Sequence, residues 1–275
     1  MSEMSSALRR ARQGARAILA ANFYNAETLL AVLRAARRTA SPVIVQTSPA
    51  TIAYLGLEQA SAMARAAARE LGVEAYLHLD HAREVGLARR CLEVGYDSVM
   101  IDASETDFDA NVECTRAVVR LAHEEGKAVE AELGYVPKVG QSPARVDTYT
   151  TPDEARAFVE ATGVDLLAVA VGSAHGFYEE TPRLDYDRLT AIRNAVDVPL
   201  VLHGSSGLGD EQLKKAIERG ICKINFATEI KDTFMRTLKG LLSSTDEIDI
   251  RKTFPAAIEA TTHLVEAKMR VCKGV

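Results

Sequence analysis

The chain has 275 residues, of which 47% are hydrophobic and 26% are charged, and 33 Lys+Arg against 38 Asp+Glu give a formal net charge of −5 at pH 7. This composition excludes a globally disordered chain, and the mildly acidic charge excludes a general affinity for nucleic acid or anionic lipid. No apolar stretch approaches the roughly 20 residues that a membrane-spanning helix needs, so we expect a soluble, cytoplasmic protein.

Along the chain, short and mostly apolar runs alternate with longer amphipathic stretches rich in Ala, Leu, Arg and Glu. The N-terminal segment is expected to form a helix and not a targeting peptide, because the apolar run 17–21 is too short for one. Runs that are apolar throughout are typical of strands buried on both faces. The eight predicted strands are Ala17–Phe23, Pro42–Thr47, Glu74–Asp80, Ser98–Asp102, Ala128–Leu133, Leu166–Val171, Pro199–His203 and Lys223–Phe226.

The predicted helices carry start and stop signals. Residues 151–154, Thr-Pro-Asp-Glu, form a capping box with proline at the first helical position. Glycine at the C-terminal end of a helix accepts the left-handed conformation without a Cβ clash. Five helical stretches end in this way, at Gly72, Gly95, Gly126, Gly163 and Gly220.

Eight buried strands separated by helices predict a closed barrel. Dividing 275 residues by eight gives about 34 per βα unit, the usual size in a (β/α)8 TIM barrel. We therefore expect one α/β domain over residues 1–275, with an extra C-terminal helix containing Pro255–Val271. An open doubly wound sheet is the alternative, but Phe23–Ala26 stands where that fold places a glycine-rich phosphate loop.

The four cysteines show no CxxC spacing and are expected to be free thiols in a reducing compartment. They are Cys91, Cys114, Cys222 and Cys272.

Polar side chains collect at the predicted strand ends, which in a barrel meet at one mouth. Three of the six histidines, His81, His175 and His203, lie there. Three imidazoles are the ligand count of a catalytic zinc with an open fourth position, although any one of them alone reads as a hydrogen-bonded rim or core residue. His78 lies three residues before His81 and would face the opposite side of an extended strand, so only His81 is expected to ligate. His123 and His263 are expected to be bystanders.

Other polar groups at this mouth allow two interpretations each. Asp80 is a candidate acid/base group, or orients an imidazole. The Gly-Ser-Ser-Gly sequence at 204–207 and the segment 225–228 predict a phosphate site, or a tight turn with a helix cap. Glu130 and Glu132 share one strand face and are either buried beside a cation or part of a rim salt bridge.

Four motifs resemble those of the class II, zinc-dependent ketose-bisphosphate aldolases, and the resemblance covers nearly the whole chain. They are LHLDH at 77–81, AVAVGSAHG at 168–176, LHGSSGL at 202–208 and KINFATE at 223–229. The chain is most similar to the tagatose-bisphosphate aldolases, because the fructose branch places Asp and Arg where this chain has Ala227 and Lys231.

The resemblance implies roles for particular residues and one zinc ion per chain, with a monovalent cation as a further bound ion. His81, His175 and His203 would hold the zinc, and Asp80 would exchange a proton with the C4 oxygen. Asp102 and Glu132 match a second metal position, and Ser48 would contact the aldehyde half. Dihydroxyacetone phosphate would bind at Gly176, Gly204, Ser205, Ser206, Asn225, Phe226, Ala227 and Thr228.

The chain departs from this family pattern in two places. Relatives carry an acidic loop after the position of Gly134, whose carboxylate takes the C3 proton, but here no carboxylate occurs before Asp147. Glu179 and Glu180 stand where some relatives carry a lysine near phosphate. Candidates to meet a distal anion, or else solvated surface charges, are Lys138, Lys231 and Arg251.

The resemblance thus implies an aldolase that reversibly cleaves a ketose 1,6-bisphosphate, of tagatose type before fructose type, into dihydroxyacetone phosphate and an aldehyde such as glyceraldehyde 3-phosphate. Alternatives are the same chemistry on a ketose 1-phosphate with an uncharged or sulfonated aldehyde half, and a non-catalytic companion subunit that binds sugar phosphates. A homodimer or homotetramer is expected, without nucleic acid or membrane partners.

Overall fold

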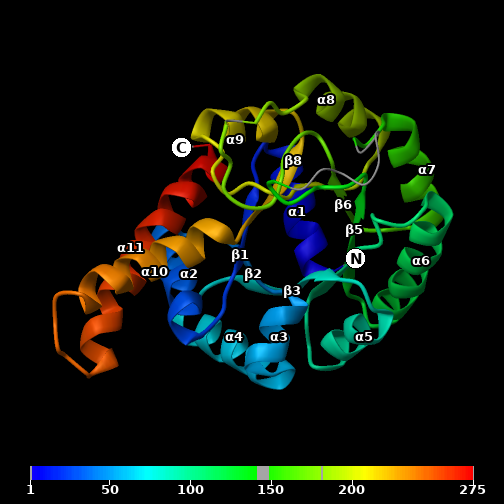
Figure 1. Cartoon of the computed structure of the whole chain (residues 1–275). Helices are drawn as coiled ribbons and strands as arrows, with labels where there is room; N and C mark the ends of the chain where they lie inside the picture. The colour runs from blue at the N-terminus through cyan, green and yellow to red at the C-terminus, as the bar shows by residue number, and fades with distance from the viewer. Residues whose placement is uncertain (1, 141–148, 181, 275) are drawn as a thin grey trace.

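The computed structural model describes residues 2–140, 149–180 and 182–274, and within them eight parallel strands close into a barrel in chain order, with β8 pairing back onto β1 (Figure 1). The predicted (β/α)8 barrel is confirmed, and the strand ends differ from the predicted ones by at most two residues. The strands are β1 Ile18–Asn22, β2 Val43–Thr47, β3 Ala75–Ala82, β4 Ser98–Ile101, β5 Ala128–Leu133, β6 Leu166–Val169, β7 Leu200–Leu202 and β8 Ile221–Phe226.

Helices surround the barrel, and the pair α10 and α11 extends outward on one side of it (Figure 1). The expected C-terminal helix is α11, which packs along α2 and α10. The helices are α1 Glu3–Gln13, α2 Ala26–Thr39, α3 Pro49–Leu55, α4 Leu57–Leu71, α5 Val85–Glu93, α6 Phe108–Glu124, α7 Pro152–Thr162, α8 Tyr186–Ala195, α9 Asp210–Glu218, α10 Thr228–Leu242 and α11 Ile250–Lys273.

The predicted helix boundaries are confirmed where the sequence marks them. The Thr151 side chain accepts a hydrogen bond from the Glu154 N–H and the Glu154 side chain bonds back to Thr151, so α7 begins with a complete capping box. All five glycines predicted at helix ends have positive φ, for example +62° at Gly72 and +69° at Gly163.

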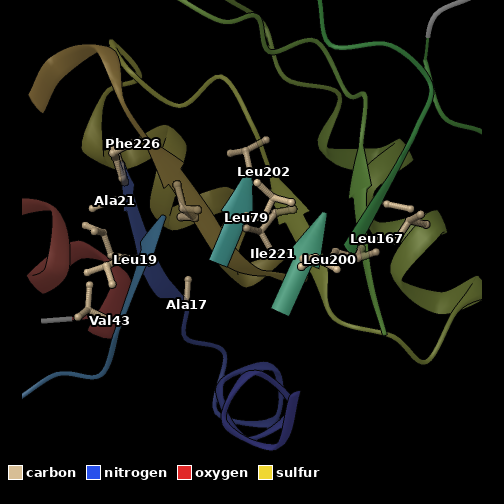
Figure 2. Close-up of a cluster of buried hydrophobic side chains, with 14 of the residues drawn as sticks. Ala17, Leu19, Ala21, Val43, Leu79, Leu167, Leu200, Leu202, Ile221 and Phe226 are labelled. Carbon is tan, nitrogen blue, oxygen red and sulfur yellow. The ribbon is translucent and has the colours of Figure 1, made fainter. Parts of the chain in front are cut away.

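Alternate residues of each strand enter two different cores. Outward-facing side chains such as Leu19, Leu79 and Phe226 pack in the layer between the barrel and its helices (Figure 2). Inward-facing side chains near the amino ends of the strands form a second cluster together with Met4 and Leu8 of α1. Helix α1 therefore closes the amino-terminal end of the barrel.

Toward the carboxyl ends of the strands, the interior of the barrel becomes polar. Gln46, His78, Glu130 and Lys223 have no exposed surface, and they come from four different strands. Hydrogen bonds from Gln46 to Asn22 and from Lys223 to Asn225 connect this layer to the mouth of the barrel.

All four cysteines are unpaired, as expected, and three of them are buried. Among the helices that the structure describes, none is both long and apolar enough to cross a membrane.

Candidate active site

The carboxyl ends of the strands bring the predicted histidines together. His81 lies on β3, His203 directly follows β7, and His175 lies in the loop after β6. Nδ1 of His203 is 2.8 Å from Nε2 of His81. Glu132 of β5 joins them, and the four ligand atoms all lie within 4.8 Å of one another.

A distortion of β3 turns His81 into this cluster. His81 has φ +53°, and the register between β3 and β4 shifts between Leu79 and Ala82. His78 lies inside the barrel below, where its Nδ1 is 2.6 Å from the Ser98 Oγ. His78 is therefore outside the cluster, but the expectation that the two histidines face opposite sides of a regular strand is wrong, because the bulge breaks the alternation.

Carboxylates fix the tautomers of two cluster histidines. Asp102 Oδ2 accepts from Nδ1 of His81 at 2.7 Å, and Glu130 Oε1 accepts from Nε2 of His203 at 2.7 Å. Because an ionised carboxylate only accepts hydrogen bonds, Nε2 of His81 and Nδ1 of His203 are the nitrogens that face the cluster. Asp102 thus lies behind the His81 ring, apart from the four-residue cluster to which Glu132 belongs.

The electrostatic environment differs among the histidines. Burial opposes a charge on His81, but attraction to Asp80 and the hydrogen bond to Asp102 outweigh it and raise the pKa of His81 to about 10. Burial and the neighbouring His81 lower the pKa of His175 to about 4. Burial, followed by the same neighbour, also lowers the pKa of His203 well below its usual value. His175 and His203 are therefore neutral imidazoles near pH 7.

A divalent metal ion fits this group of donors. Glu132 is 1% exposed, and its Oε2 has no hydrogen-bond partner among the described residues, whereas Oε1 accepts from the Val136 N–H at 3.1 Å. Burial, then repulsion by Asp102, raise the pKa of Glu132 to about 8. A cation among three imidazole nitrogens would satisfy this buried oxygen, and nitrogen and carboxylate donors suit first-row divalent metals.

Asp80 lies beside the histidine cluster, and each of its carboxylate oxygens accepts a hydrogen bond. Asn22 donates to Oδ2 at 2.9 Å and Asn225 donates to Oδ1 at 3.2 Å. Burial would raise the pKa of Asp80, but attraction to His81 and Lys223 and the hydrogen bond from Asn22 outweigh it and lower the pKa. Asp80 is therefore an ionised carboxylate with a fixed orientation.

A pocket joins Asp80, His81 and His175 to the candidate phosphate residues. Its walls include Gly176 and the loop 204–206 after β7, and Ala227 and Thr228 at the start of α10. Helix N-termini attract anions, because their first N–H groups have no partner within the helix. Residues lining the pocket are Asn22, Asp80, His81, His175, Gly176, Gly204, Ser205, Ser206, Asn225, Ala227 and Thr228.

Tyr178 ties the two loops of this pocket together. Its hydroxyl accepts from the Ala174 N–H at 2.7 Å and donates to the Gly204 carbonyl at 2.6 Å. The loop that carries His175 and the loop that carries the serines are therefore held in one arrangement.

We expect Gly204→Ala to destabilise the protein and weaken anion binding. An added Cβ would lie 2.5 Å from the Ala174 carbonyl oxygen, and Gly204 has φ +65°. Gly126→Ala is the matched control, because its φ is +67° and no atom lies within 4 Å of its added Cβ. The left-handed backbone costs about 1 kcal/mol in both variants, while the clash adds about 1–3 kcal/mol in Gly204→Ala only. Thermal melts of both variants measure this difference, and equal melting temperatures would contradict it.

Comparison with known proteins identifies the family. The family model for class-II fructose-bisphosphate aldolase matches residues 2–275. The chain belongs to the class II fructose-bisphosphate aldolase family. Members of this family are metal-dependent, so the chain is a metal-dependent aldolase, which is a lyase. The substrates of the family are phosphorylated ketoses and dihydroxyacetone phosphate.

Solved structures agree with this class II aldolase assignment. The YdjI aldolase of Escherichia coli K12 is 34% identical with a TM-score of 0.88, over 98% of this chain and 96% of that one. A Coccidioides immitis protein described as a presumed fructose-1,6-bisphosphate aldolase is 34% identical with a TM-score of 0.86, over 96% and 93%. A fructose-bisphosphate aldolase of Campylobacter jejuni, 22% identical with a TM-score of 0.83 over 98% and 93%, shares the fold.

Two residues that were expected to contact the substrate, Phe226 and Ser48, do not line the pocket. Phe226 is 1% exposed and its side chain packs in the outer core, so only its backbone is near the pocket (Figure 2). Ser48 caps α3 by accepting from the Thr51 N–H. The alternation of β8 explains the first case, because Asn225 points inward and Phe226 therefore points outward.

The segment after β5 packs on His175. The His175 N–H donates to the Pro137 carbonyl at 2.7 Å, and the Val139 N–H donates to the His175 carbonyl at 2.8 Å. The described part of this loop, residues 134–140, carries no carboxylate. Asp147, the predicted alternative base, lies outside the described residues.

Asn22, Lys223 and Tyr178 belong to the site but were not predicted from the sequence. Asn22 ends an otherwise apolar strand, and Lys223 is a charge within a predicted buried strand. A polar residue on the inward face of a buried strand is the signal that would have found both of them.

Proposed function

We propose that the chain is a zinc-dependent aldolase that cleaves a ketose 1,6-bisphosphate, of tagatose type before fructose type, into dihydroxyacetone phosphate and an aldehyde such as glyceraldehyde 3-phosphate. One observation carries this proposal: the oriented carboxylate of Asp80 lies 4.0 Å from Nε2 of His81, in the pocket that also contains Gly204 and the serines after it. A candidate acid/base group, two of the candidate metal ligands and a candidate anion site thus line one pocket.

In this proposal His81, His175 and His203 hold zinc, and Glu132 offers a further oxygen. The zinc would act as a Lewis acid that polarises the ketose carbonyl and stabilises negative charge developing on its oxygen. Asp102 and Glu130 keep the ligating nitrogens of His81 and His203 turned toward the ion.

Asp80 moves a proton at the C4 oxygen. In the cleavage direction its ionised carboxylate accepts the proton of the C4 hydroxyl as the C3–C4 bond breaks, and in condensation it returns that proton to the aldehyde oxygen. The amides of Asn22 and Asn225 hold both carboxylate oxygens, which fixes the direction of this transfer.

The phosphate of the dihydroxyacetone half is assigned to the small-residue loops. Gly176, Gly204, Ser205 and Ser206 offer N–H and hydroxyl donors, and Thr228 begins α10, whose N-terminal dipole favours an anion. The side chain of Phe226 takes no part in this binding.

Zinc-dependent exchange of the C3 proton of dihydroxyacetone phosphate into D2O, followed by NMR, tests the proposal without a choice of aldehyde. We expect exchange that stops with chelator and returns with added zinc. No exchange by protein with verified bound zinc would contradict the proposed activity and favour a companion subunit that binds sugar phosphates without cleaving them.

The strand-eight motif supports the tagatose-type substrate. Ala227 lines the pocket where the fructose branch of the family places an aspartate, and the ammonium of Lys231 lies 5.2 Å from the ring centroid of Tyr24. Turnover of tagatose and fructose 1,6-bisphosphates, which differ at C4, measures the preference. Ala227→Asp is expected to shift it toward fructose 1,6-bisphosphate.

A second candidate substrate is a ketose 1-phosphate with an uncharged aldehyde half. The described residues that line the pocket include no lysine and no arginine, so the pocket offers no cationic side chain to a second phosphate. A higher kcat/KM for ketose 1-phosphates than for either bisphosphate would replace the first candidate with this one.

Association of the chain with itself is part of the proposal. Apolar side chains are exposed in the turn between α10 and α11 and at the start of α11, with Ile248 94% and Ile250 57% exposed. Light scattering of the purified protein distinguishes a monomer from the proposed homodimer or homotetramer.

A further inference from the structure

Two charged side chains face each other inside the barrel, one layer below the candidate site. Lys223 of β8 and Glu130 of β5 have no exposed surface, and Nζ of Lys223 lies 2.8 Å from Oε2 of Glu130. A buried ion pair is weak evidence for stability, because the desolvation of two charges opposes their attraction, and apolar residues of the same volume often serve as well. Both side chains also form hydrogen bonds to residues of the site above them.

Glu130 forms a hydrogen bond to the cluster of candidate metal ligands above it. Its second oxygen, Oε1, accepts from Nε2 of His203 at 2.7 Å. This bond places the imidazole proton on Nε2 and leaves the lone pair of Nδ1 directed toward His81, 2.8 Å away. Without a pure acceptor at this position, the ring of His203 would lose both its tautomer and its orientation.

Lys223 reaches upward to the acid/base group. Its ammonium donates to Oδ1 of Asn225 at 2.8 Å. An ammonium only donates, so the Asn225 amide must present its NH₂ group on the other side, where it donates to Asp80 Oδ1 at 3.2 Å. A flipped amide would instead place an oxygen against the carboxylate.

We propose that Lys223 and Glu130 form one positioning unit, in which a single buried ion pair sets both the ligating nitrogen of His203 and the orientation of Asp80 through Asn225. This inference rests on the proposed roles of His203 and Asp80. Neither Lys223 nor Glu130 lines the pocket, so each acts through the residue above it.

The Glu130 half of the proposal is tested by metal affinity in the absence of substrate. In Glu130→Gln, one end of the amide is an NH₂ group, which must face either the Nε2–H of His203 or the ammonium of Lys223, so one donor–donor conflict is unavoidable. We expect the dissociation constant for Co²⁺, measured by chelator competition, to rise about 10- to 100-fold. The visible spectrum of bound Co²⁺ is expected to change, because it reports ligand geometry.

Glu211→Gln is the matched control for this measurement. It makes the same chemical change in an exposed ion pair, where Glu211 lies 2.9 Å from Lys214 and its side chain is 88% exposed. Unchanged Co²⁺ affinity and spectrum in Glu130→Gln, equal to those of the control, would overturn the assignment.

The Lys223 half is tested by Lys223→Met, which frees the Asn225 amide but leaves Glu130 on His203. We expect Co²⁺ affinity to stay within about threefold of wild type, while kcat falls about tenfold at unchanged KM because only the transition-state geometry at Asp80 is lost. A raised KM at unchanged kcat would contradict this half.

The double variant Glu130→Gln/Lys223→Met separates positioning from stability and remains informative if Lys223→Met fails to fold. Removing both charges leaves no unpaired buried charge, so its melting temperature should recover relative to Lys223→Met. We expect the losses of Co²⁺ affinity and of kcat to persist. Recovery of all three quantities together would show that the pair is structural only.

The metal measurements contain no substrate. A wild type that binds Co²⁺ but exchanges no C3 proton would therefore contradict the proposed function and leave the Glu130 result standing.

Discussion

His175→Ala is expected to remove metal binding and to lower aldolase turnover at least about 1,000-fold, because the loss of a ligand weakens a catalytic metal site and the site supplies the Lewis acid. His175 is the most selective choice among the cluster histidines. Its side chain has no hydrogen bond among the described residues. Its ring meets the rings of His81 and His203 edge-on, with centroid-to-centroid distances of 4.9 and 5.8 Å. Metal content by atomic absorption and turnover of the purified variant check this expectation.

His123→Ala is the control for His175→Ala. His123 makes an exposed hydrogen bond to Asp165 at 2.9 Å, and we expect its loss to leave both metal content and turnover unchanged. Full metal content in His175→Ala, together with turnover near wild type, would remove this histidine from the proposed ligand set.

Asp80→Asn is expected to lower kcat for cleavage about 100- to 10,000-fold while the metal stays bound, which is the usual range for the loss of a general acid/base. The substitution also sets an NH₂ group against one of two amide donors, since Asn22 and Asn225 each donate to a different oxygen of Asp80. We therefore expect the variant to melt at a lower temperature than wild type.

A comparison of two reactions locates the role of Asp80. Exchange of the C3 proton of dihydroxyacetone phosphate involves no C4 oxygen, so Asp80→Asn should retain exchange while losing cleavage. Asp232→Asn, in an exposed pair with Arg236 at 2.8 Å, is expected to leave both reactions unchanged. Equal losses of exchange and cleavage in Asp80→Asn would assign Asp80 to the C3 proton or to metal binding instead.

The sequence predicted the barrel well because its strands are buried on both faces. A strand between two apolar layers must be apolar throughout, and the interruptions between such strands carry helix signals as clear as Gly72 and the Thr151 capping box. The strand ends were less certain, because the last residues of a barrel strand are polar. In β3 the strand continues through His81 to Ala82, beyond the predicted end at Asp80.

The candidate metal ligands His81, His175 and His203 could be predicted because the same residue type recurs at the ends of several predicted strands. The prediction failed where the function depends on which side of a strand a residue faces. Lys223 faces inward and was not predicted, whereas the side chain of Phe226 faces outward and was wrongly expected at the substrate. The bulge at His81, with φ +53°, depends on tertiary contacts that no local pattern records.

Helix α1 has a consequence that reaches the opposite end of the molecule. Met4 is fully buried, and its sulfur accepts a hydrogen bond at 3.1 Å from Ser98, whose hydroxyl also contacts His78. Helix α1 thus covers the end of the barrel that lies opposite the candidate site. Lys223 and Glu130 attract each other strongly because no solvent reaches them. Water entering past α1 would screen their charges. The N-terminal helix thereby maintains the dry interior on which the chemistry at the rim depends.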